Sequence, residues 1–520
     1  MSPEPKPGRA WGWPLLALLA GAVWAFMFGR RGYVLAPWVA LVPTLLLLGH
    51  PRAGRLSFLS SMAFWVFAIP WIAPTLVTFG GLGTTLGILG LLILAAILSS
   101  YAALFGWLAG PLWRDGRPFA VLAGIPAAWV VAEWLRGHLF SGFPWNLAAY
   151  AFLEVPGALA LSSWVGAYGV SFLVVSANVA VATMVARRQW RAGGLALAAA
   201  VLALVAAGSL ARPAKPPSTA ATSEARLLQP NIPNMVFFDA ALARRNYAKV
   251  LEMSRRACDR EGVLLLWPES AAWPFLYQND VQLRMDLASL AASGCPVLLN
   301  SAHQEADGRW FNSALLVSGP EAPQRYDKGH LVPWGEYVPF HGLIPFYDRL
   351  SRNAGDFTPA SRPVQLDWDG QRLGMAICYE VVFPEEVALR VRDGATVLAS
   401  ITNDAWYGDT WAPWQHLAAA RFRAAETARP LLRAAITGVS AVIGPDGRVE
   451  AQLGVGEEGF LPVTVSGGTG RTPFVRLPHA APLACALLTL AAILLVRRRP
   501  RNTVPPPPQL NPPKEVSTTS

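Results

Sequence analysis

The sequence predicts a bundle of membrane-spanning helices that carries an α/β domain on one side of the membrane. The chain has 520 residues, of which 53% are hydrophobic and only 15% charged, and this composition is typical of a membrane protein. The apolar residues are concentrated in residues 11–211 and 479–496. Residues 212–478 have an ordinary globular composition and the length of a domain.

The two apolar regions divide into about eight predicted spans, because a helix that crosses the hydrocarbon core needs about 20 apolar residues. Residues 479–496 form the last span, and the tail at residues 497–520 is too polar and proline-rich to pack. The seven preceding spans are predicted at residues 11–28, 34–49, 56–78, 83–112, 119–136, 161–186 and 194–211.

Lysine and arginine predict the orientation, because short cytoplasmic loops retain positive charge. With residues 1–10 in the cytoplasm, only Arg30, Arg31 and Arg136 fall in the opposite short loops. Residues 212–478 then face away from the cytoplasm, and the eighth span returns the tail to it. The net charge of +10 largely reflects this topology. No basic patch indicates a nucleic-acid partner.

Residues 212–478 show strand-length apolar runs that alternate with helical patterns, which predicts an α/β domain with helices covering its sheets. Helices are predicted near residues 240–261, 281–293, 384–393 and 414–428. Strands are predicted at residues 225–229, 263–267, 296–300, 313–318, 373–378, 396–402 and 441–444.

Three residues of this domain form a candidate catalytic set. Glu269 follows one predicted strand, Cys378 ends another, and Lys328 lies before a loop rich in Gly, Pro and aromatic residues. Cysteine attacks as a thiolate, and its ordinary pKa of about 8.5 leaves little thiolate at neutral pH without a base or a positive charge. Glu269 can supply the base, and Lys328 can stabilise the thiolate and an oxyanion. The set predicts acyl transfer without a metal or cofactor.

Each of these residues also has a simpler explanation. Cys378 alone is consistent with a small buried hydrophobic residue, Glu269 with a helix cap and Lys328 with a solvated surface charge. The cysteine count adds one constraint. Cys485 lies in the eighth span, so the outer domain holds an odd number, Cys258, Cys295 and Cys378. At least one thiol there stays unpaired within the chain.

The motifs around these residues resemble the Glu-Lys-Cys signature of the nitrilase superfamily. They are Trp267-Pro268-Glu269-Ser270, Lys328 with His330-Leu331-Val332-Pro333, and Ile377-Cys378-Tyr379-Glu380. Together with the eight spans, nearly the whole chain resembles the apolipoprotein N-acyltransferase family. The resemblance implies a nitrilase-like, four-layer αββα domain on the periplasmic side of a bacterial inner membrane. It also implies a protein that acts as a monomer.

The resemblance further implies a two-step reaction. A phospholipid such as phosphatidylethanolamine gives its sn-1 acyl chain to Cys378 as a thioester, and the thioester acylates the α-amino group of an apolipoprotein's S-diacylglyceryl-cysteine. Glu269 is then the base, Lys328 the oxyanion stabiliser and Cys378 the nucleophile. Glu336, Tyr379 and Glu380 match supporting positions.

Several residues are candidates for lipid binding, because both substrates are held in a bilayer and aromatic side chains suit its interface. Arg136 either pairs with Glu133 or meets a phosphate headgroup. The chain departs from the family at Phe238, where a tryptophan is usual, and at Ile436, where an asparagine is common. The full set of binding candidates is Arg136, Phe143, Trp145, Phe238, Trp334, Trp406 and Trp414.

Two other functions fit parts of the pattern. A membrane-anchored amidase or nitrilase would form the same thioester and release the acyl group to water. Eight spans exceed what tethering requires, which favours lipid substrates. A non-catalytic scaffold or transporter is the second alternative, but transporters usually carry charged or broken segments at mid-membrane, and these spans have few charges.

Overall fold

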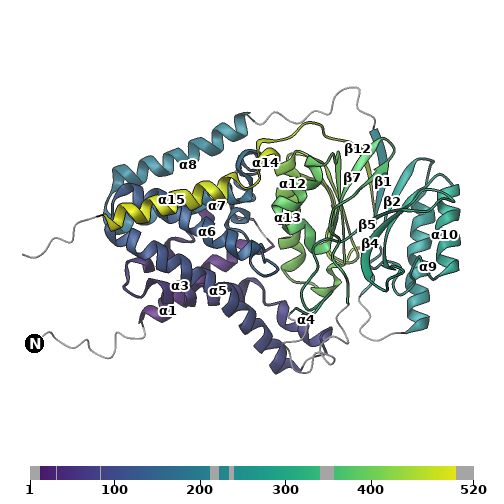
Figure 1. Cartoon of the computed structure of the whole chain (residues 1–520), viewed down its shortest axis with the longest axis horizontal. Helices are drawn as coiled ribbons and strands as arrows, with labels where there is room; N and C mark the ends of the chain where they lie inside the picture. The colour runs from purple at the N-terminus through teal and green to yellow at the C-terminus, as the bar shows by residue number, and fades with distance from the viewer. Residues whose placement is uncertain are drawn as a thin grey trace, which may run out of the picture.

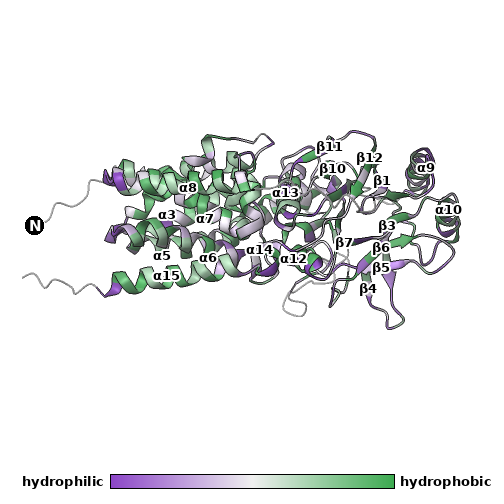
Figure 2. Ribbon diagram, turned by 90° about the horizontal axis from the view of Figure 1, so that it is seen from above, coloured by the Kyte–Doolittle hydropathy of each residue, from purple (hydrophilic) through white to green (hydrophobic). Residues whose placement is uncertain are grey.

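The structure is a computed structural model that describes residues 12–30, 32–81, 83–210, 222–233, 239–339 and 356–498. A bundle of helices forms one end of the molecule, and two β-sheets with covering helices form the other (Figure 1). The helices of the bundle are predominantly hydrophobic, whereas the sheet-containing end mixes polar and apolar residues (Figure 2). This division agrees with the predicted fold class.

Four helices of the described residues are long and apolar enough to cross a membrane: α5 (Thr84–Asp115), α7 (Ala158–Arg187), α8 (Trp190–Leu210) and α15 (Ala480–Arg497). A fifth span results if α3 (Ala53–Ala68) and α4 (Ile72–Thr78), which meet at a 55° bend, are counted together.

The other three predicted spans coincide with shorter or irregular elements, so the count of eight stays a prediction. Residues 11–28 and 34–49 correspond to the shorter apolar helical segments Gly12–Phe28 and Ala36–Gly49. The first includes α1 (Gly12–Ala25), and the second contains prolines that interrupt it and includes α2 (Val42–Leu46). Residues 119–136 correspond to a π-helical turn followed by α6 (Ile125–His138).

The other end of the molecule is built on two six-stranded sheets. The first has the order β12-β1-β2-β3-β4-β5 and the second β11-β10-β9-β8-β7-β6. The first sheet comprises β1 (Thr222–Gln229), β2 (Val263–Leu266), β3 (Val297–Gln304), β4 (Trp310–Val317), β5 (Gln324–Asp327) and β12 (Gly459–Ser466). The second comprises β6 (Gln365–Trp368), β7 (Gln371–Ile377), β8 (Val397–Thr402), β9 (Leu431–Ala435), β10 (Ser440–Ile443) and β11 (Val449–Leu453).

Side-chain alternation along the strands produces the four layers. In β2, Leu264 and Leu266 point into the core between the sheets, whereas Val263 and Leu265 point to the opposite face. That outer face is covered by α9 (Ala240–Ala257) and α10 (Val281–Ala292). The outer face of the second sheet is covered by α12 (Pro384–Arg392) and α13 (Ala412–Thr427) (Figure 1). The predicted αββα sandwich is therefore present.

The α12–α13 layer also packs against the helical bundle, and one continuous hydrophobic core includes residues of both. Gln415 of α13 shows how close the contact is. Its side-chain amide donates to the carbonyl oxygens of Phe28 (3.1 Å) and Ala68 (2.8 Å) in the bundle, and its Oε1 accepts from the Trp145 indole (2.8 Å). The connection α14 (Pro473–Arg476) then leads into α15.

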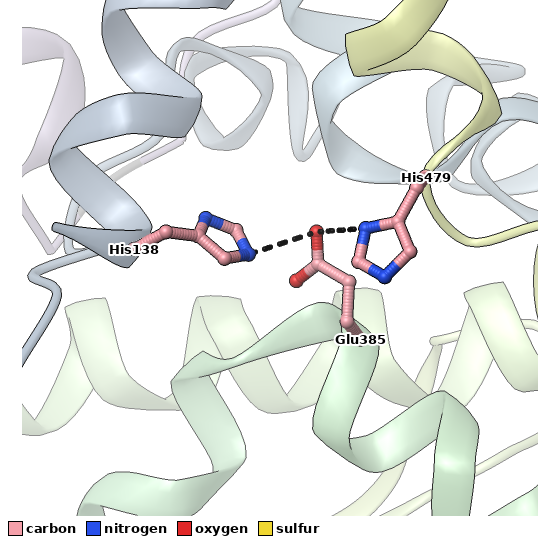
Figure 3. A group of neighbouring side chains, drawn as sticks. All are labelled: His138, Glu385 and His479. Atoms are coloured by element: carbon pink, nitrogen blue, oxygen red, sulfur yellow. Dashed lines mark ion pairs between the residues drawn. The ribbon is translucent and has the colours of Figure 1, made fainter.

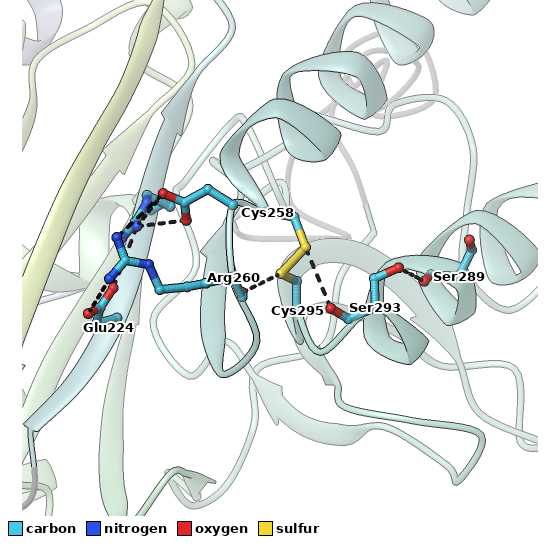
Figure 4. The surroundings of a disulfide bond; sticks show 8 residues. Glu224, Cys258, Arg260, Ser289, Ser293 and Cys295 are labelled. Atoms are coloured by element: carbon cyan, nitrogen blue, oxygen red, sulfur yellow. Dashed lines mark hydrogen bonds and ion pairs between the residues drawn. A yellow bond between two sulfur atoms is a disulfide. The ribbon is translucent and has the colours of Figure 1, made fainter.

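A disulfide joins Cys258, just after α9, to Cys295, just before β3 (Figure 4). The described cysteines without a disulfide are Cys378 and Cys485, both buried. The prediction that at least one thiol of the outer domain stays unpaired is therefore confirmed, and the unpaired one is Cys378.

Candidate active site

Cys378 follows β7 directly and begins the short helical turn η7 (Cys378–Val382), which leads into α12. Its φ of 52° lies in the left-handed region, a conformation that costs a non-glycine residue about 1 kcal/mol or more, so surrounding contacts must hold the turn. Burial and the nearby Glu269 carboxylate raise the pKa of the Cys378 thiol, although Lys328 opposes the shift. The resting thiol therefore keeps its proton at neutral pH and needs a base to become a nucleophile.

Glu269 lies just after β2, and burial raises the pKa of its carboxyl group despite the opposing charge of Lys328. One carboxylate oxygen accepts the backbone N–H of Asn403 (2.9 Å), and the other accepts the side-chain amide of Asn312 (3.2 Å). The two donors orient the carboxylate and stabilise its ionised form. Glu269 thus has the position and the raised pKa of a general base for Cys378.

Lys328 lies just after β5 and is only 1% exposed. Burial alone would lower the pKa of its amine, but the carboxylates of Glu336 and Glu269 outweigh that effect and raise it. The Lys328 Nζ lies 2.9 Å and 2.8 Å from the two oxygens of Glu336. Lys328 is therefore a permanent positive charge beside the thiol, where it can stabilise an oxyanion.

Glu380 holds the two parts of the site together. Its buried carboxylate accepts the backbone N–H of Ile377 (2.8 Å), one residue before the cysteine, and that of Gly329 (2.9 Å), one residue after the lysine. It also accepts the Tyr326 hydroxyl (2.8 Å) and pairs with Arg390 (3.0 Å). The predicted supporting residues Glu336 and Glu380 thus have distinct structural roles.

A second network, formed by His416, Asp404 and Arg433, supports the backbone of the cysteine. His416 of α13 donates from Nε2 to the carbonyl oxygen of Cys378 (3.1 Å), and its other ring nitrogen faces Arg433 and Asp404 (both 3.1 Å). Burial lowers the pKa of His416, which keeps the ring neutral. Although burial opposes it, Arg433 and His416 lower the pKa of Asp404 to about 2.

Asn312 was not predicted as a site residue. The polar pair Asn312-Ser313 interrupts the apolar residues of β4 (Trp310–Val317), and this was the available signal. Its side-chain amide contacts both Glu269 (3.2 Å) and Glu336 (2.6 Å), so it links the base to the partner of the lysine.

Tyr379 connects the nucleophile to the bundle. Its hydroxyl donates to the carbonyl oxygen of Gly142 (3.1 Å), and its ring is stacked at 6.4 Å from that of Trp145. Phe143 and Trp145 lie in the segment after α6, and Trp145 is almost fully buried. The rings of Phe143 and Trp145 therefore both lie beside Tyr379, which belongs to the same turn as Cys378.

Arg136 holds this same segment in place. Its guanidinium donates to the carbonyl oxygens of Phe143 (2.6 Å) and Trp145 (2.8 Å) and lies 3.7 Å from Glu133. Two partners were predicted for Arg136. Glu133 lies beside it in the structure, whereas binding of a phosphate headgroup stays a prediction.

The remaining binding candidates are dispersed. Trp334 and Trp406 are exposed, at 48% and 41%, and Trp414 is half-buried in α13. Phe238 lies outside the described residues. Ile436, the other departure from the family pattern, is buried in the core under α9 and α10. The substrate-binding roles of all these residues stay predictions.

Two parts of the sequence match known protein families. Residues 224–473 match the carbon-nitrogen hydrolase family, and residues 20–180 match the apolipoprotein N-acyltransferase N-terminal domain. The apolipoprotein N-acyltransferase of Geobacter metallireducens is 33% identical over 91% of this chain and 92% of its own length. That of Ralstonia nicotianae is 36% identical over 83% of both chains, and that of Bordetella bronchiseptica is 33% identical over 95% and 98%.

The αββα sandwich that carries the buried glutamate, lysine and cysteine is thus a domain of the carbon-nitrogen hydrolase family, attached to a bundle of apolar helices. The matches to known relatives cover both the helical bundle and the sandwich, and they therefore identify a narrower family. The chain belongs to the apolipoprotein N-acyltransferase family and is a membrane-bound acyltransferase.

Proposed function

We propose that the protein completes lipoprotein maturation. It transfers the sn-1 acyl chain of a phospholipid, through a thioester on Cys378, to the α-amino group of the S-diacylglyceryl-cysteine of an apolipoprotein. One observation carries this proposal: Glu269, Lys328 and Cys378 are all buried, and the turn that carries Cys378 packs directly onto the membrane bundle through Tyr379. A water-soluble substrate would not require that contact.

The first step forms the thioester. The Glu269 carboxylate takes the proton of the Cys378 thiol while sulfur attacks the ester carbonyl carbon of the phospholipid. The resulting oxyanion accepts hydrogen bonds from the Lys328 amine and from a backbone N–H beside the cysteine. The C–O bond of the ester then breaks, and the leaving alkoxide takes the proton from Glu269. The products are a lysophospholipid and an acyl-Cys378 thioester.

The second step forms the amide. The neutral α-amino group attacks the thioester carbonyl, and Glu269 accepts a proton from the nitrogen. The same oxyanion donors stabilise the second tetrahedral intermediate. The C–S bond breaks, and the proton held by Glu269 returns to the sulfur. Because Lys328 stays protonated, only Glu269 gains and loses a proton in each step.

We also propose that the catalytic domain faces the periplasm of a bacterial inner membrane and that the protein acts as a monomer. The basic residues of the short loops support this orientation. The Cys258–Cys295 disulfide supports it independently, because such bonds persist in oxidising compartments and are rare in the cytosol.

Mass spectrometry of the purified protein tests the reaction. After incubation with phosphatidylethanolamine, the intact protein should gain the mass of one acyl chain, and a peptide map should place it on Cys378. A diacylated lipopeptide with a free amine should remove the adduct, whereas the same lipopeptide with an acetylated amine should leave it. Cys378→Ala should give no adduct and no product.

Two results would reject the proposal. Adduct formation in Cys378→Ala would exclude this residue as the nucleophile. Discharge of the wild-type adduct by water, at a rate that the free-amine lipopeptide does not increase, would instead support a hydrolase.

A further inference from the structure

Three residues at the junction of the bundle and the catalytic domain form a cluster that catalysis does not use. They are His138 at the end of α6, Glu385 at the start of α12 and His479 just before α15 (Figure 3). One ring nitrogen of each histidine and one oxygen of Glu385 all lie within 4.8 Å of one another. The three residues are far apart in sequence, and each comes from a different helix.

The spacing of these atoms is unusual for hydrogen bonds. The His138 Nε2 lies 3.6 Å and the His479 Nδ1 lies 4.0 Å from the same oxygen of Glu385. Both distances exceed the range of a nitrogen–oxygen hydrogen bond. They are close to the separation of about 3.3 Å between ligand atoms around a tetrahedral zinc ion, whose bonds to nitrogen and oxygen are about 2.0–2.1 Å long.

The hydrogen bonds of His138 fix which nitrogen is available. Its Nδ1 lies 2.8 Å from the carbonyl oxygen of Trp134, and because a carbonyl only accepts, Nδ1 must carry the proton. In the neutral ring, Nε2 then has a free lone pair that faces Glu385. A backbone carbonyl that orients a histidine in this way is common behind metal-binding histidines. Stacking on the Trp134 ring, at 4.4 Å, restricts the imidazole further.

One oxygen of the Glu385 carboxylate lacks a hydrogen-bond donor within the part of the chain that the structure describes. The Glu385 side chain is 11% exposed, and this oxygen faces both histidines. A cation between the three side chains would satisfy the carboxylate and both imidazole lone pairs. His479, with its side chain 52% exposed, leaves a route for the cation from solvent.

We propose that His138, Glu385 and His479 bind a divalent transition-metal ion of the zinc class. Two imidazole nitrogens and one carboxylate oxygen are a donor set that such ions prefer. Water completes the coordination. The ion clamps α12, which begins six residues after Cys378, to the ends of two bundle helices. The clamp lies outside the catalytic set, which needs no metal.

Zinc titration of the full-length protein tests the site. The protein is purified in detergent with a tag that lacks histidine, stripped with a chelator, and titrated with zinc chloride. One zinc per chain should bind with micromolar or tighter affinity and raise the unfolding temperature. His138→Gln, His479→Gln and Glu385→Gln should each weaken binding by at least about tenfold and abolish the zinc-dependent rise.

Two matched variants serve as controls. His303→Gln removes a histidine that lies 4.0 Å from a single carboxylate, Glu305, and should bind zinc as the wild type does. Cys378→Ala removes the active-site thiol, which could itself ligate zinc, and should also bind zinc normally. Absence of saturable binding, binding that survives all three cluster variants, or binding that depends on Cys378 would each overturn the proposal.

Cobalt provides a readout that does not depend on how well the variants fold. Co²⁺ bound to the wild-type cluster should give the visible d–d absorption of a nitrogen- and oxygen-ligated ion, and excess Zn²⁺ should remove it. An intense near-ultraviolet band from a sulfur ligand would instead place the metal on the active-site thiol and contradict the assignment.

Discussion

The two halves of the sandwich share one layered plan but have different neighbours. In the first half, α9 (Ala240–Ala257) buries one face on its sheet, whereas its opposite face carries exposed charged residues such as Glu252 and Arg255. In the second half, α13 (Ala412–Thr427) lies between its sheet and the bundle and is buried on nearly every side. The same position in the fold thus requires an amphipathic helix in one half and an almost wholly buried helix in the other.

The halves also divide the chemistry. Glu269 and Lys328, the base and the cation, follow strands of the first sheet, whereas Cys378 follows a strand of the second. The nucleophile therefore belongs to the half that contacts the bundle. The position of the thiol therefore depends on the bundle, whereas the solvent-facing helices contribute mainly to stability.

The largest expected effect comes from a buried ion pair in the second half. Glu426 lies 2.7 Å from Arg423, both side chains are fully buried, and Glu426 also accepts the backbone N–H of Ala167 in α7 (2.6 Å). Glu426→Gln would leave the guanidinium buried without a counter-charge, at a cost of about 4 kcal/mol. Denaturant unfolding in detergent should show this loss.

The matched control makes the same chemical change in the first half. Glu252→Gln alters an exposed carboxylate of α9, and its effect on unfolding should stay within about 0.5 kcal/mol. If the two variants lost equal stability, the difference between the buried and the solvent-facing helical layers would be refuted.

The second prediction concerns the disulfide of the first half. Cys258 and Cys295 are 37 residues apart, and removal of a crosslink that closes a loop of this length should cost about 3.8 kcal/mol. The bond lies at the ends of β2 and β3 opposite to Glu269, so the catalytic set should be unaffected. The double variant Cys258→Ser/Cys295→Ser should therefore unfold earlier but keep wild-type turnover below its unfolding temperature. A proportional loss of kcat at low temperature would contradict this separation.

Most of the fold could be predicted, because periodicity identifies strands that are strongly apolar. The run at residues 263–267 became β2, and the run at residues 396–402 became β8. The strands β5, β6, β9, β11 and β12 were not predicted. Two of them, β5 (Gln324–Asp327) and β11 (Val449–Leu453), lack an apolar run. Their pairing partners are set by tertiary contacts that local pattern does not contain.

The site was predictable only in part, for a similar reason. Glu269, Lys328 and Cys378 lie in local motifs that mark them individually. Asn312 contacts Glu336, 24 positions away, and His416 contacts Cys378, 38 positions away, and nothing in their immediate sequence indicates those partners. The residues that orient a site are therefore harder to predict than the residues that react.

The third prediction tests the link between base and cation in the first half. If Glu269 is the general base proposed above, it acts when ionised, so activity should be present above its pKa and be lost as the pH falls through it. The negative charge of Glu336 contributes to the raised pKa of Glu269. Glu336→Gln should therefore shift the acid limb of kcat/KM to lower pH. It should also reduce kcat about tenfold, because Lys328 loses its partner.

A surface carboxylate provides the control for this pH profile. Glu305 pairs with Arg325 (2.5 Å) in the same half but does not contact the catalytic set, so Glu305→Gln should leave the acid limb in place. A shift of the Glu336→Gln limb to higher pH would show that Glu336 does not raise the pKa of Glu269.

The smallest expected effect concerns a helix cap in the solvent-facing layer. The Asp280 side chain accepts the backbone N–H of Leu283 (2.7 Å) and so caps the start of α10. Asp280→Ala should reduce the free energy of unfolding by about 1 kcal/mol, whereas Asp280→Asn keeps the acceptor and should retain most of the stability. Turnover should equal that of the wild type in both variants, because α10 packs on the outer face of the first sheet and against α9, away from the catalytic set. A clear fall in kcat for Asp280→Ala alone would mean that the solvent-facing helices also position the base, and the division between the two halves would then be incomplete.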